Sequence, residues 1–284
     1  MNRAPERIVC LSAEAADWFW RIGAWEKVAG VTAFFTQPPD APPKPRVSGF
    51  SSANLPEIEK LNPDLIVTFS DVQSQLAAEL IRRGFPVLAT NQRTLAEIEN
   101  TLALLSRMVG HESERLLGEF RERLAPVEKS SRSPRVYFEE WNEPLISGIA
   151  WVGELIERAG GRDIFPELKS KRAAMERTVS SEQVCAANPE IIFASWCGKP
   201  VQPDEISTRP GWAELAAVRA GRIHEIPGED ILQPGFRLVH GYELMKKIIG
   251  RQLPTGGGCI AAQLLPNSQS SRANLLLNRA TDSL

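Results

Sequence analysis

The sequence has few cysteines and histidines, and their spacing argues against the simplest metal and disulfide scaffolds. The four cysteines form no Cys-x-x-Cys pair, and the three histidines lie far apart. Zinc ribbons and disulfide-bonded domains both need closely patterned cysteine or histidine residues. We therefore expect no disulfide scaffold, no resident metal and no cofactor.

A strong net charge and a long hydrophobic run are also missing. The formal net charge is -2 over 284 residues, which gives no field for attracting nucleic acid. No apolar stretch reaches the roughly 20 residues that a membrane span requires. A hydrophobic fraction of 43% with 24% charged residues is typical of a globular chain. We expect a globular monomer with no nucleic-acid partner and no membrane insertion.

The first residues carry no secretory signal pattern. Residues 1–7 are polar and lead directly into the apolar residues 8–11. A signal peptide needs an apolar core of about 7–15 residues followed by a small-residue cleavage site. Taken literally, this start predicts a cytoplasmic protein. The alternative is that a leader is missing from the sequence.

The chain contains two copies of one pattern, about 127 residues apart. In each copy an apolar strand is followed by a short helix, an Asn-Pro-acid stop and a second strand. The residue before a proline is pushed out of the helical region, so the helix ends there. The ranges are 7–11, 57–61, 62–64 and 65–69 in the first copy, and 135–138, 182–187, 188–190 and 191–194 in the second.

The repeat continues with a helix, a glycine and a strand. Residues 76–83 are followed by Gly84 and a strand at 85–88, and residues 213–220 by Gly221 and a strand at 222–226. Glycine just past a helix adopts the left-handed cap conformation. Strands that alternate with helices indicate parallel sheets covered on both faces. The predicted fold class is α/β, with two Rossmann-like lobes around central parallel sheets.

A helical segment is expected between the lobes. Thr94 and Glu97 match a capping box, and apolar residues then recur at helical spacing to about residue 129, with an interruption at Gly110. We predict an N-terminal lobe at 1–92, a long linking helix at 93–130 and a C-terminal lobe at 131–253. The alternative is that this helix only covers one lobe. Residues 254–284, rich in Gly, Ser and Asn, are expected to form a poorly ordered tail.

No catalytic motif is present. The chain lacks a dinucleotide-binding glycine pattern, a Walker loop and a G-x-S-x-G elbow. Cys197 follows an expected strand, but no base can be identified beside it. His240 lies within an apolar helical pattern, which favours packing over metal ligation. We therefore expect no catalytic residue and no enzyme activity.

Aromatic residues gather beyond the carboxyl ends of the expected strands, where open parallel sheets bind ligands. Flat side chains there predict an apolar cleft with polar groups at its edge, although each aromatic alone could equally be core. A proline-rich loop at 38–45 is expected to position the chain before Phe50; a ligand for a partner domain is the alternative. The candidate contacts are Phe34, Phe50, Phe69, Ser70 and Asp71 in the first half, and Glu140, Trp141, Trp151 and Trp196 in the second.

Over roughly residues 6–250 the sequence resembles the substrate-binding proteins of ABC importers for cobalamin and ferric siderophores. The stretch NLPEIEKLNPDLIV at 54–67 is similar to the most recognisable segment of that family, and VSSEQVCAANPEIIF at 179–193 to its second-lobe equivalent. The run YFEEWNEPLISG at 137–148, with SWCGK at 195–199 and RPGW at 209–212, looks most like the cobalamin-binding branch. The resemblance implies two lobes joined by one long helix, limited hinge motion and a ligand held between them.

The resemblance also implies roles for individual residues. Phe34, Phe50 and Phe69 fall where family members place aromatics against the corrin ring. One surface glutamate per lobe is expected to dock on an ABC permease. Glu182 matches the second of these; Pro56 occupies the first position, so Glu57, one residue on, is the candidate there.

Three functions follow from these observations. The leading hypothesis is a periplasmic, non-catalytic protein that captures a corrinoid and delivers it to an ABC permease. A second is a ferric-siderophore or haem binder of the same fold. The expected cleft has more carboxylates than bases, and Arg46, Lys171 and Arg172 are the cations that could reverse that balance for an anionic ligand. A third is a cytoplasmic corrinoid-handling protein or enzyme, which the absent leader would favour.

Overall fold

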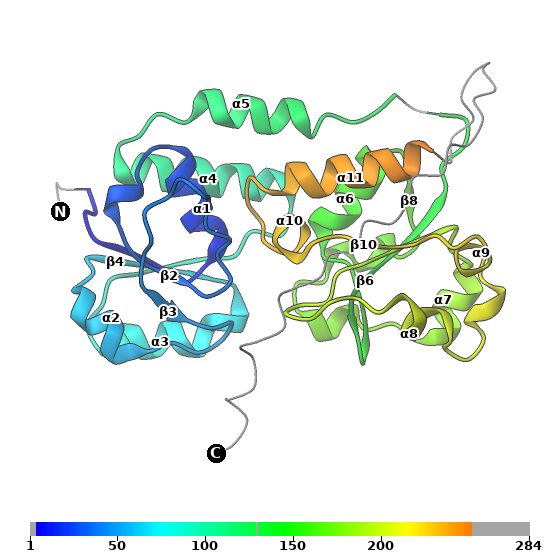
Figure 1. Cartoon of the computed structure of the whole chain (residues 1–284), viewed down its shortest axis with the longest axis horizontal. Helices are drawn as coiled ribbons and strands as arrows, with labels where there is room; N and C mark the ends of the chain where they lie inside the picture. The colour runs from blue at the N-terminus through cyan, green and yellow to red at the C-terminus, as the bar shows by residue number, and fades with distance from the viewer. Residues whose placement is uncertain (1–3, 129, 252–284) are drawn as a thin grey trace. The chain divides into compact units, whose positions relative to one another are not determined.

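The computed structural model describes residues 4–128 and 130–251 (Figure 1). Its compact unit is Met1–Leu253, and Pro254–Leu284 form the remainder of the chain. The tail predicted at 254–284 therefore lies outside the described residues.

The compact unit contains two separate five-stranded sheets, one in each half of the sequence. The first is wholly parallel, in the order β3-β2-β1-β4-β5. The second has the order β10-β9-β6-β7, with β7 antiparallel and β8 parallel to β6. The α/β fold class with two lobes is confirmed. The strands are β1 Ile8–Cys10, β2 Val28–Thr32, β3 Arg46–Ser48, β4 Leu65–Phe69, β5 Val87–Thr90, β6 Arg135–Asn142, β7 Leu145–Ser147, β8 Arg162–Asp163, β9 Ile191–Ala194 and β10 Ile223–Glu225.

Helices cover both faces of each sheet. In β1, Ile8 and Cys10 pack into a core shared with α1 and α4, whereas Val9 between them packs with α2 and α3. This alternation follows from the two-residue period of a strand. The helices are α1 Ala13–Arg21, α2 Leu55–Leu61, α3 Ser74–Arg82, α4 Leu95–Val109, α5 Glu114–Arg123, α6 Ala150–Arg158, α7 Ser181–Ala187, α8 Pro203–Ser207, α9 Ala216–Arg219, α10 Gly228–Ile231 and α11 Leu238–Gly250.

The sequence repeat is also a repeat of hydrogen bonds. Helices α2 and α7 end at Asn62 and Asn188, both in the left-handed conformation with a φ of 45°. The acid two residues further on then accepts a backbone N–H at the start of the lobe's first strand. Asp64 Oδ1 accepts from the residue before β1 at 2.9 Å, and Glu190 Oε2 accepts from the first residue of β6 at 3.1 Å. The Asn-Pro-acid stop thus ties helix end to strand start in both lobes.

The linking segment is a helix pair, so the prediction of one long helix over 93–130 is wrong. The capping box of Thr94 and Glu97 is present and starts α4. Gly110 ends it with a left-handed φ of 72°, and α5 then begins at Glu114. The second helix returns beside the first, where Arg121 Nη1 of α5 donates to Glu99 Oε1 of α4 at 2.6 Å. Gly110 is a chain reversal because glycine takes this conformation without steric cost.

A second difference concerns residues 213–220. Instead of one helix, the chain forms a 3₁₀ turn at Trp212–Glu214 and the short helix α9. Leu215 separates them with an extended backbone, φ -61° and ψ 137°. The glycines predicted to cap the preceding helices, Gly84 and Gly221, both have positive φ, which confirms that part of the repeat.

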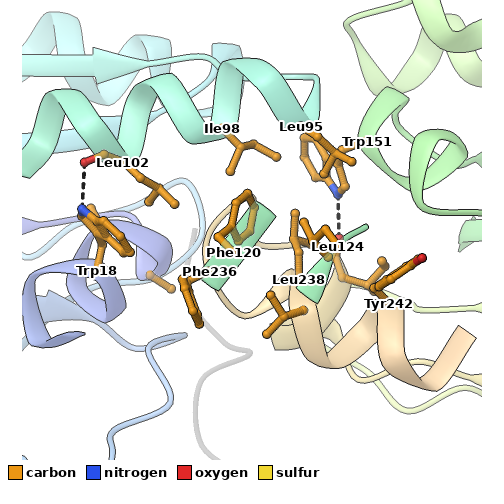
Figure 2. Packing of buried hydrophobic residues seen from close by; sticks show 14 of the residues in the cluster. Trp18, Leu95, Ile98, Leu102, Phe120, Leu124, Trp151, Phe236, Leu238 and Tyr242 are labelled. Carbon is orange, nitrogen blue, oxygen red and sulfur yellow. Dashed lines mark hydrogen bonds between the residues drawn. The ribbon is translucent and has the colours of Figure 1, made fainter. Parts of the chain in front are cut away.

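The two lobes share one continuous hydrophobic core (Figure 2). Trp18 of α1 stacks on Phe236, which precedes α11, at a ring separation of 6.0 Å. Its indole Nε1 also donates to Leu102 O of α4 at 2.8 Å. Phe120 of α5 packs against the same Phe236 ring. Separating the lobes widely would expose these rings to water, which opposes a large hinge motion.

Within residues 4–128 and 130–251, no helix combines the length and apolarity needed to cross a bilayer.

Candidate ligand-binding site

Two exposed aromatic rings lie at the carboxyl edge of the first sheet. Phe34 is in the turn after β2 and Phe50 follows β3. Their relative exposures are 41% and 52%, and the rings meet edge to face with centroids 6.0 Å apart. Large exposed apolar side chains in contact with each other are typical of binding surfaces. The structure therefore brings these two predicted contacts together.

Hydrogen bonds fix the chain that carries Phe34. The guanidinium Nη1 of Arg46 donates to the carbonyl oxygens of Thr32, Ala33 and Phe35 at 3.0, 3.1 and 2.9 Å. From the second half of the chain, Gln233 Nε2 donates to Phe34 O at 3.2 Å. These bonds agree with a positioning role for the loop before Phe50. They also hold the exposed Arg46 side chain against its own lobe.

Gln73 joins the remaining first-lobe elements and was missed by sequence reasoning. Its side chain accepts from the backbone N–H of Phe69 at 2.9 Å and donates to Phe50 O at 2.9 Å and to Leu11 O at 3.1 Å. Ser70, between strand and turn, has a φ of 61°, and its Oγ accepts from the Val72 backbone N–H. The buried Gln73 amide thus holds the ends of β1 and β4 and the Phe50 loop together.

Phe69 and Asp71 meet a buried arginine. Phe69 is half-buried at the end of β4, and the Arg93 guanidinium lies over its ring, 5.5 Å from the centroid. Arg93 Nη2 donates to Asp71 Oδ1 at 2.6 Å. An arginine above an aromatic face is favourable because of the ring quadrupole. Sequence reasoning missed Arg93 because it attributed the Thr94 region only to helix capping.

In the second lobe, Glu140 and Trp141 lie on β6. Glu140 pairs with Arg177, with Nη1 and Nη2 donating to its two oxygens at 2.5 and 3.1 Å. Trp141 is half-buried, its Nε1 donates to Glu143 O at 2.8 Å, and the Lys199 ammonium lies 4.5 Å from its ring centroid. Trp141 keeps a place near the end of β6, although a cation already lies over its ring.

Two of the predicted contacts, Trp151 and Trp196, are buried instead of exposed. Trp151 lies in α6 within the shared core, where its Nε1 donates to Ile231 O at 2.8 Å. Trp196 follows β9 but is buried against the second sheet, because its Nε1 donates to Glu139 Oε1 at 3.0 Å. Neither ring is exposed for contact with a ligand in this structure. The position after a strand was correct for Trp196, but the direction of its side chain was not readable from the sequence.

The end of β6 is held by a buried ion pair. Glu139 is fully buried, and Arg209 Nη1 and Nη2 donate to its two oxygens at 2.5 and 2.8 Å. A buried carboxylate persists when it is paired and hydrogen-bonded on both oxygens. The same carboxylate receives the Trp196 indole, so this pair sets the position of that ring.

The charged groups of the two halves are close enough to influence each other. Burial lowers the pKa of Arg93, and the charge of Arg177 in the second half lowers that pKa further, while Asp71 and Glu140 raise it. Arg177 lies in a 3₁₀ turn, Ala174–Arg177, which no sequence pattern marked.

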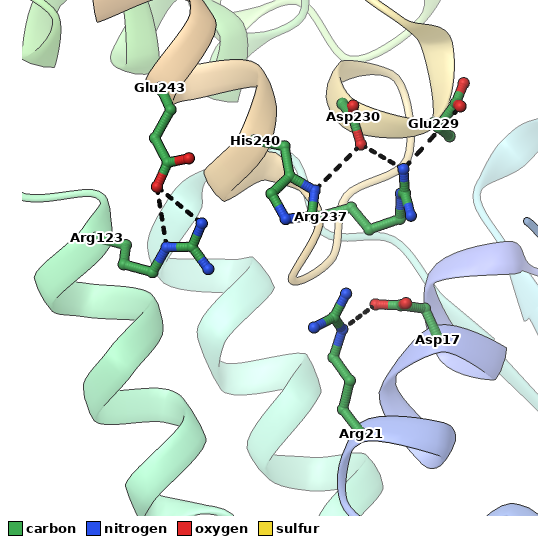
Figure 3. A network of polar contacts seen from close by, with 8 residues as sticks. All are labelled: Asp17, Arg21, Arg123, Glu229, Asp230, Arg237, His240 and Glu243. Atoms are coloured by element: carbon green, nitrogen blue, oxygen red, sulfur yellow. Dashed lines mark hydrogen bonds and ion pairs between the residues drawn. The ribbon is translucent and has the colours of Figure 1, made fainter. Parts of the chain in front are cut away.

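Two side chains, Cys197 and His240, bear on potential thiol or metal chemistry. Burial, with a smaller contribution from Glu140, raises the pKa of the Cys197 thiol, which disfavours the reactive thiolate. His240 of α11 lies 3.5 Å from Asp230, which also pairs with Arg237 at 2.7 Å (Figure 3). In the part of the chain that the structure describes, no three His, Cys, Asp or Glu side chains converge to hold a metal ion.

The two glutamates considered for docking lie in the first turns of α2 and α7. Asn54 caps α2 and Ser180 caps α7. Glu182 is the second residue of its helix, exposed, and a hydrogen bond with the Ser180 hydroxyl lowers its pKa. Glu57 is the third residue of its helix and pairs with Lys60 at 2.6 Å. The two carboxylates are thus offset by one residue around their helices.

One hollow of about 610 Å³ lies elsewhere on the first lobe. It contains none of the predicted ligand contacts, so the cleft expected between the lobes stays a prediction. Its lining residues are Trp20, Gly23, Trp25, Glu26, Pro42 and Lys44.

Comparisons with known proteins support one family. The family model described as periplasmic binding protein matches residues 8–229. The vitamin B12-binding protein of Vibrio cholerae is 26% identical over 246 residues, covering 84% of this chain and 87% of that protein.

Solved structures agree on the fold. The structure of the periplasmic vitamin B12 binding protein of Vibrio cholerae has a TM-score of 0.66 at 24% identity, covering 87% of this chain and 98% of that one. The periplasmic heme-binding protein of Roseiflexus sp. RS-1 in apo form has a TM-score of 0.71 at 20% identity, covering 86% and 97%. With a family match over most of its length and this shared fold, the chain belongs to the periplasmic binding protein family.

Proposed function

We propose that this protein captures a corrinoid between its two lobes and delivers it to an ABC permease. The observation that carries the proposal is the exposed pair Phe34 and Phe50 at the carboxyl edge of the first sheet. Phe69 lies at the end of β4 in the same sheet. A curated relative is named a vitamin B12-binding protein, which agrees with a large, flat ligand of this kind.

The physical basis is burial of a flat ligand against aromatic faces. Removing about 100 Å² of apolar surface from water at each ring contributes roughly 2.5 kcal/mol. Part of this gain is offset by the entropy lost on association. The hydrogen bonds of Arg46 and Gln73 hold the loops before binding, which reduces the further cost of ordering them. Capture and release of this kind need no catalytic group, and we propose that the protein is not an enzyme.

Delivery requires a surface that the permease can recognise. Each lobe carries one carboxylate in the first turn of a helix. Glu182 is the second residue of α7, and Glu57 is the third residue of α2. We propose that these carboxylates meet cationic side chains of the permease while the protein, as a monomer, works outside the cytoplasmic membrane. Rim charges of this type set association rate and orientation more than affinity.

Calorimetric titration with cyanocobalamin tests the capture step. We expect binding by the full chain and about tenfold weaker binding by Phe50→Ala, because one ring contact is lost. Ile81→Ala, an equally exposed apolar side chain on α3, serves as the matched control and should bind as the native protein does. No heat at tens of micromolar ligand would exclude a corrinoid carrier.

A haem or ferric siderophore is the second candidate ligand. The observation that favours it is the pair of buried arginines, Arg93 and Arg177. Their positive charge suits an anionic ligand, whereas the sequence predicted a cleft with more carboxylates than bases. Titration with haemin separates the two: tighter binding of haemin than of cyanocobalamin would make haem the ligand class.

A further inference from the structure

The turn that carries Phe34 is held by hydrogen bonds from both lobes. Arg46 of the first lobe donates to the carbonyl oxygens of three of the four residues 32–35. The remaining carbonyl, that of Phe34, accepts from Gln233 Nε2 of the second lobe at 3.2 Å. The bond to the carbonyl of the exposed ring residue therefore comes from the opposite lobe.

The backbone of Phe34 is tied on both sides. Its amide N–H donates to the Thr32 hydroxyl at 3.4 Å, and its carbonyl accepts from Gln233. The first bond restrains rotation about the N–Cα bond, and the second restrains rotation about the Cα–C bond. Because a residue has only these two soft backbone torsions, the pair of bonds sets the direction in which the Phe34 ring leaves the chain. The ring then meets that of Phe50.

Residues 233–236 of the second lobe lie against the first lobe, and we call them the strap. They lie between α10 and α11. Pro234 O accepts from Gln92 Nε2 at 3.3 Å in a buried hydrogen bond. Gly235 lies so close to Glu14 that a Cβ on it would be 2.6 Å from the Glu14 Cβ. The middle of the strap is thus seated on the first lobe.

An aromatic ring anchors the end of the strap. Phe236 is buried, and its ring lies 6.0 Å from that of Trp18 and 5.8 Å from that of Phe120 (Figure 2). Moving these rings apart would expose apolar surface to water. A change in the spacing of the lobes therefore acts on the strap, and Gln233 joins the strap to the Phe34 carbonyl.

This arrangement leaves the ring accessible. Gln233 is half-buried, and the Phe34 residue whose carbonyl it binds is 41% exposed. The backbone oxygen is occupied by the strap, while the ring stays open to a ligand.

We propose that Gln233 is a positioning residue for ligand capture. Through the Phe34 carbonyl it holds the exposed Phe34 ring in the orientation that receives the flat ligand. It also makes that orientation depend on the contact between the lobes. The inference rests on the proposed function in one respect, that the Phe34 ring contacts the ligand. Gln233 acts through Phe34 and needs no ligand contact of its own.

Calorimetric titration with cyanocobalamin measures the effect on capture. Gln233→Met keeps the length of the side chain but has no N–H donor, so it should bind about fivefold more weakly than the native chain. Gln233→Arg keeps N–H donors at the end of a longer side chain and should bind as the native chain does. Gln202→Met, at an exposed glutamine just before α8 on the same lobe, is the matched control and should also bind normally.

A double-mutant cycle shows whether Gln233 acts through the Phe34 ring. Phe34→Ala removes the ring and should weaken binding about tenfold. Adding Gln233→Met should then weaken binding no further, because no ring is left to position. Additive losses, or native affinity in Gln233→Met, would overturn the inference while leaving corrinoid capture intact. So would a loss in Gln233→Arg as large as that in Gln233→Met.

A measurement without ligand separates this inference from the proposed function. NMR on the ligand-free full chain with labelled phenylalanine rings follows the contact between the Phe34 and Phe50 rings. Their cross-peak should be strong in the native chain and in Gln233→Arg, and weaker in Gln233→Met. An unchanged cross-peak in Gln233→Met would overturn the positioning role whatever the ligand is. If the native chain binds no cyanocobalamin but the cross-peak weakens as expected, the corrinoid assignment falls and the positioning role stands.

Discussion

Glu14 in the first turn of α1 is a buried carboxyl at the contact between the lobes. Gly235, from the second half, packs so closely that a Cβ on it would lie 2.6 Å from the Glu14 Cβ. The Glu14 Oε1 has no hydrogen-bond partner among the described residues. Burial raises the pKa of Glu14 from 4.5 to about 7, although its own backbone N–H and the Ser12 hydroxyl partly oppose the rise. Ionisation of this group should therefore destabilise the folded protein.

The sign and size follow from this pKa. Below pH 4.5 the carboxyl is protonated in both folded and unfolded chains, so it imposes no electrostatic cost. Between pH 4.5 and about 7 the unfolded chain loses the proton first, and the free energy of unfolding falls as pH rises. Above that range the loss is complete. At about 1.4 kcal/mol per pKa unit, the rise in the Glu14 pKa from 4.5 to about 7 lowers the free energy of unfolding by about 3 kcal/mol.

Glu14→Gln removes the ionisation while keeping the shape. Urea unfolding followed by tryptophan fluorescence should show the variant more stable than the native protein by about 3 kcal/mol at pH 8, with a much smaller difference at pH 5. Glu122→Gln on exposed α5 is the matched control and should show no such pH-dependent gain. A Glu14→Gln variant that is no more stable at pH 8, or whose gain does not depend on pH, would refute the assignment of a protonated, buried carboxyl.

Three further predictions follow. Arg209→Met leaves the Glu139 carboxylate buried without its partner and should lower the free energy of unfolding by about 3–5 kcal/mol. Adding Glu139→Gln should recover much of that loss. An unchanged urea midpoint for Arg209→Met would contradict the prediction. Trp18→Phe removes the indole donor to Leu102 O and should cost about 1–3 kcal/mol in thermal unfolding, whereas equal melting temperatures would count against this bond. Glu182→Lys should reduce ligand uptake by host cells with unchanged cyanocobalamin affinity; full uptake would argue against docking at this carboxylate.

The repeated parts of the fold were predictable because their signals are local. A proline excludes the helical conformation for the residue before it, so both Asn-Pro-acid stops predicted real helix ends. The bond from each acid to the start of its lobe's first strand was not part of that local signal. Gly84 and Gly221 were readable for the same reason. The reversal at Gly110 was not, because an apolar stripe continues at helical spacing on both sides of it. Helical periodicity gives the face of a helix but not the direction in which the next helix runs.

The site was predictable only in part. Chain position predicted that Phe34 and Phe50 lie at one edge of the first sheet, as they do in the structure, since loops after parallel strands meet at one edge. It could not give side-chain direction, and Trp151 and Trp196 proved to be buried because distant acceptors, Ile231 O and Glu139, bind their indole N–H groups. Arg93 was missed for a related reason: its partner Asp71 is 22 residues away, and such pairing depends on tertiary structure.

Co-crystallisation with cyanocobalamin tests the central claim most directly. The account predicts electron density for the corrin ring against Phe34 and Phe50. A corrin ring bound away from both phenylalanines, or crystals in which the lobes stay sealed at saturating ligand, would contradict it.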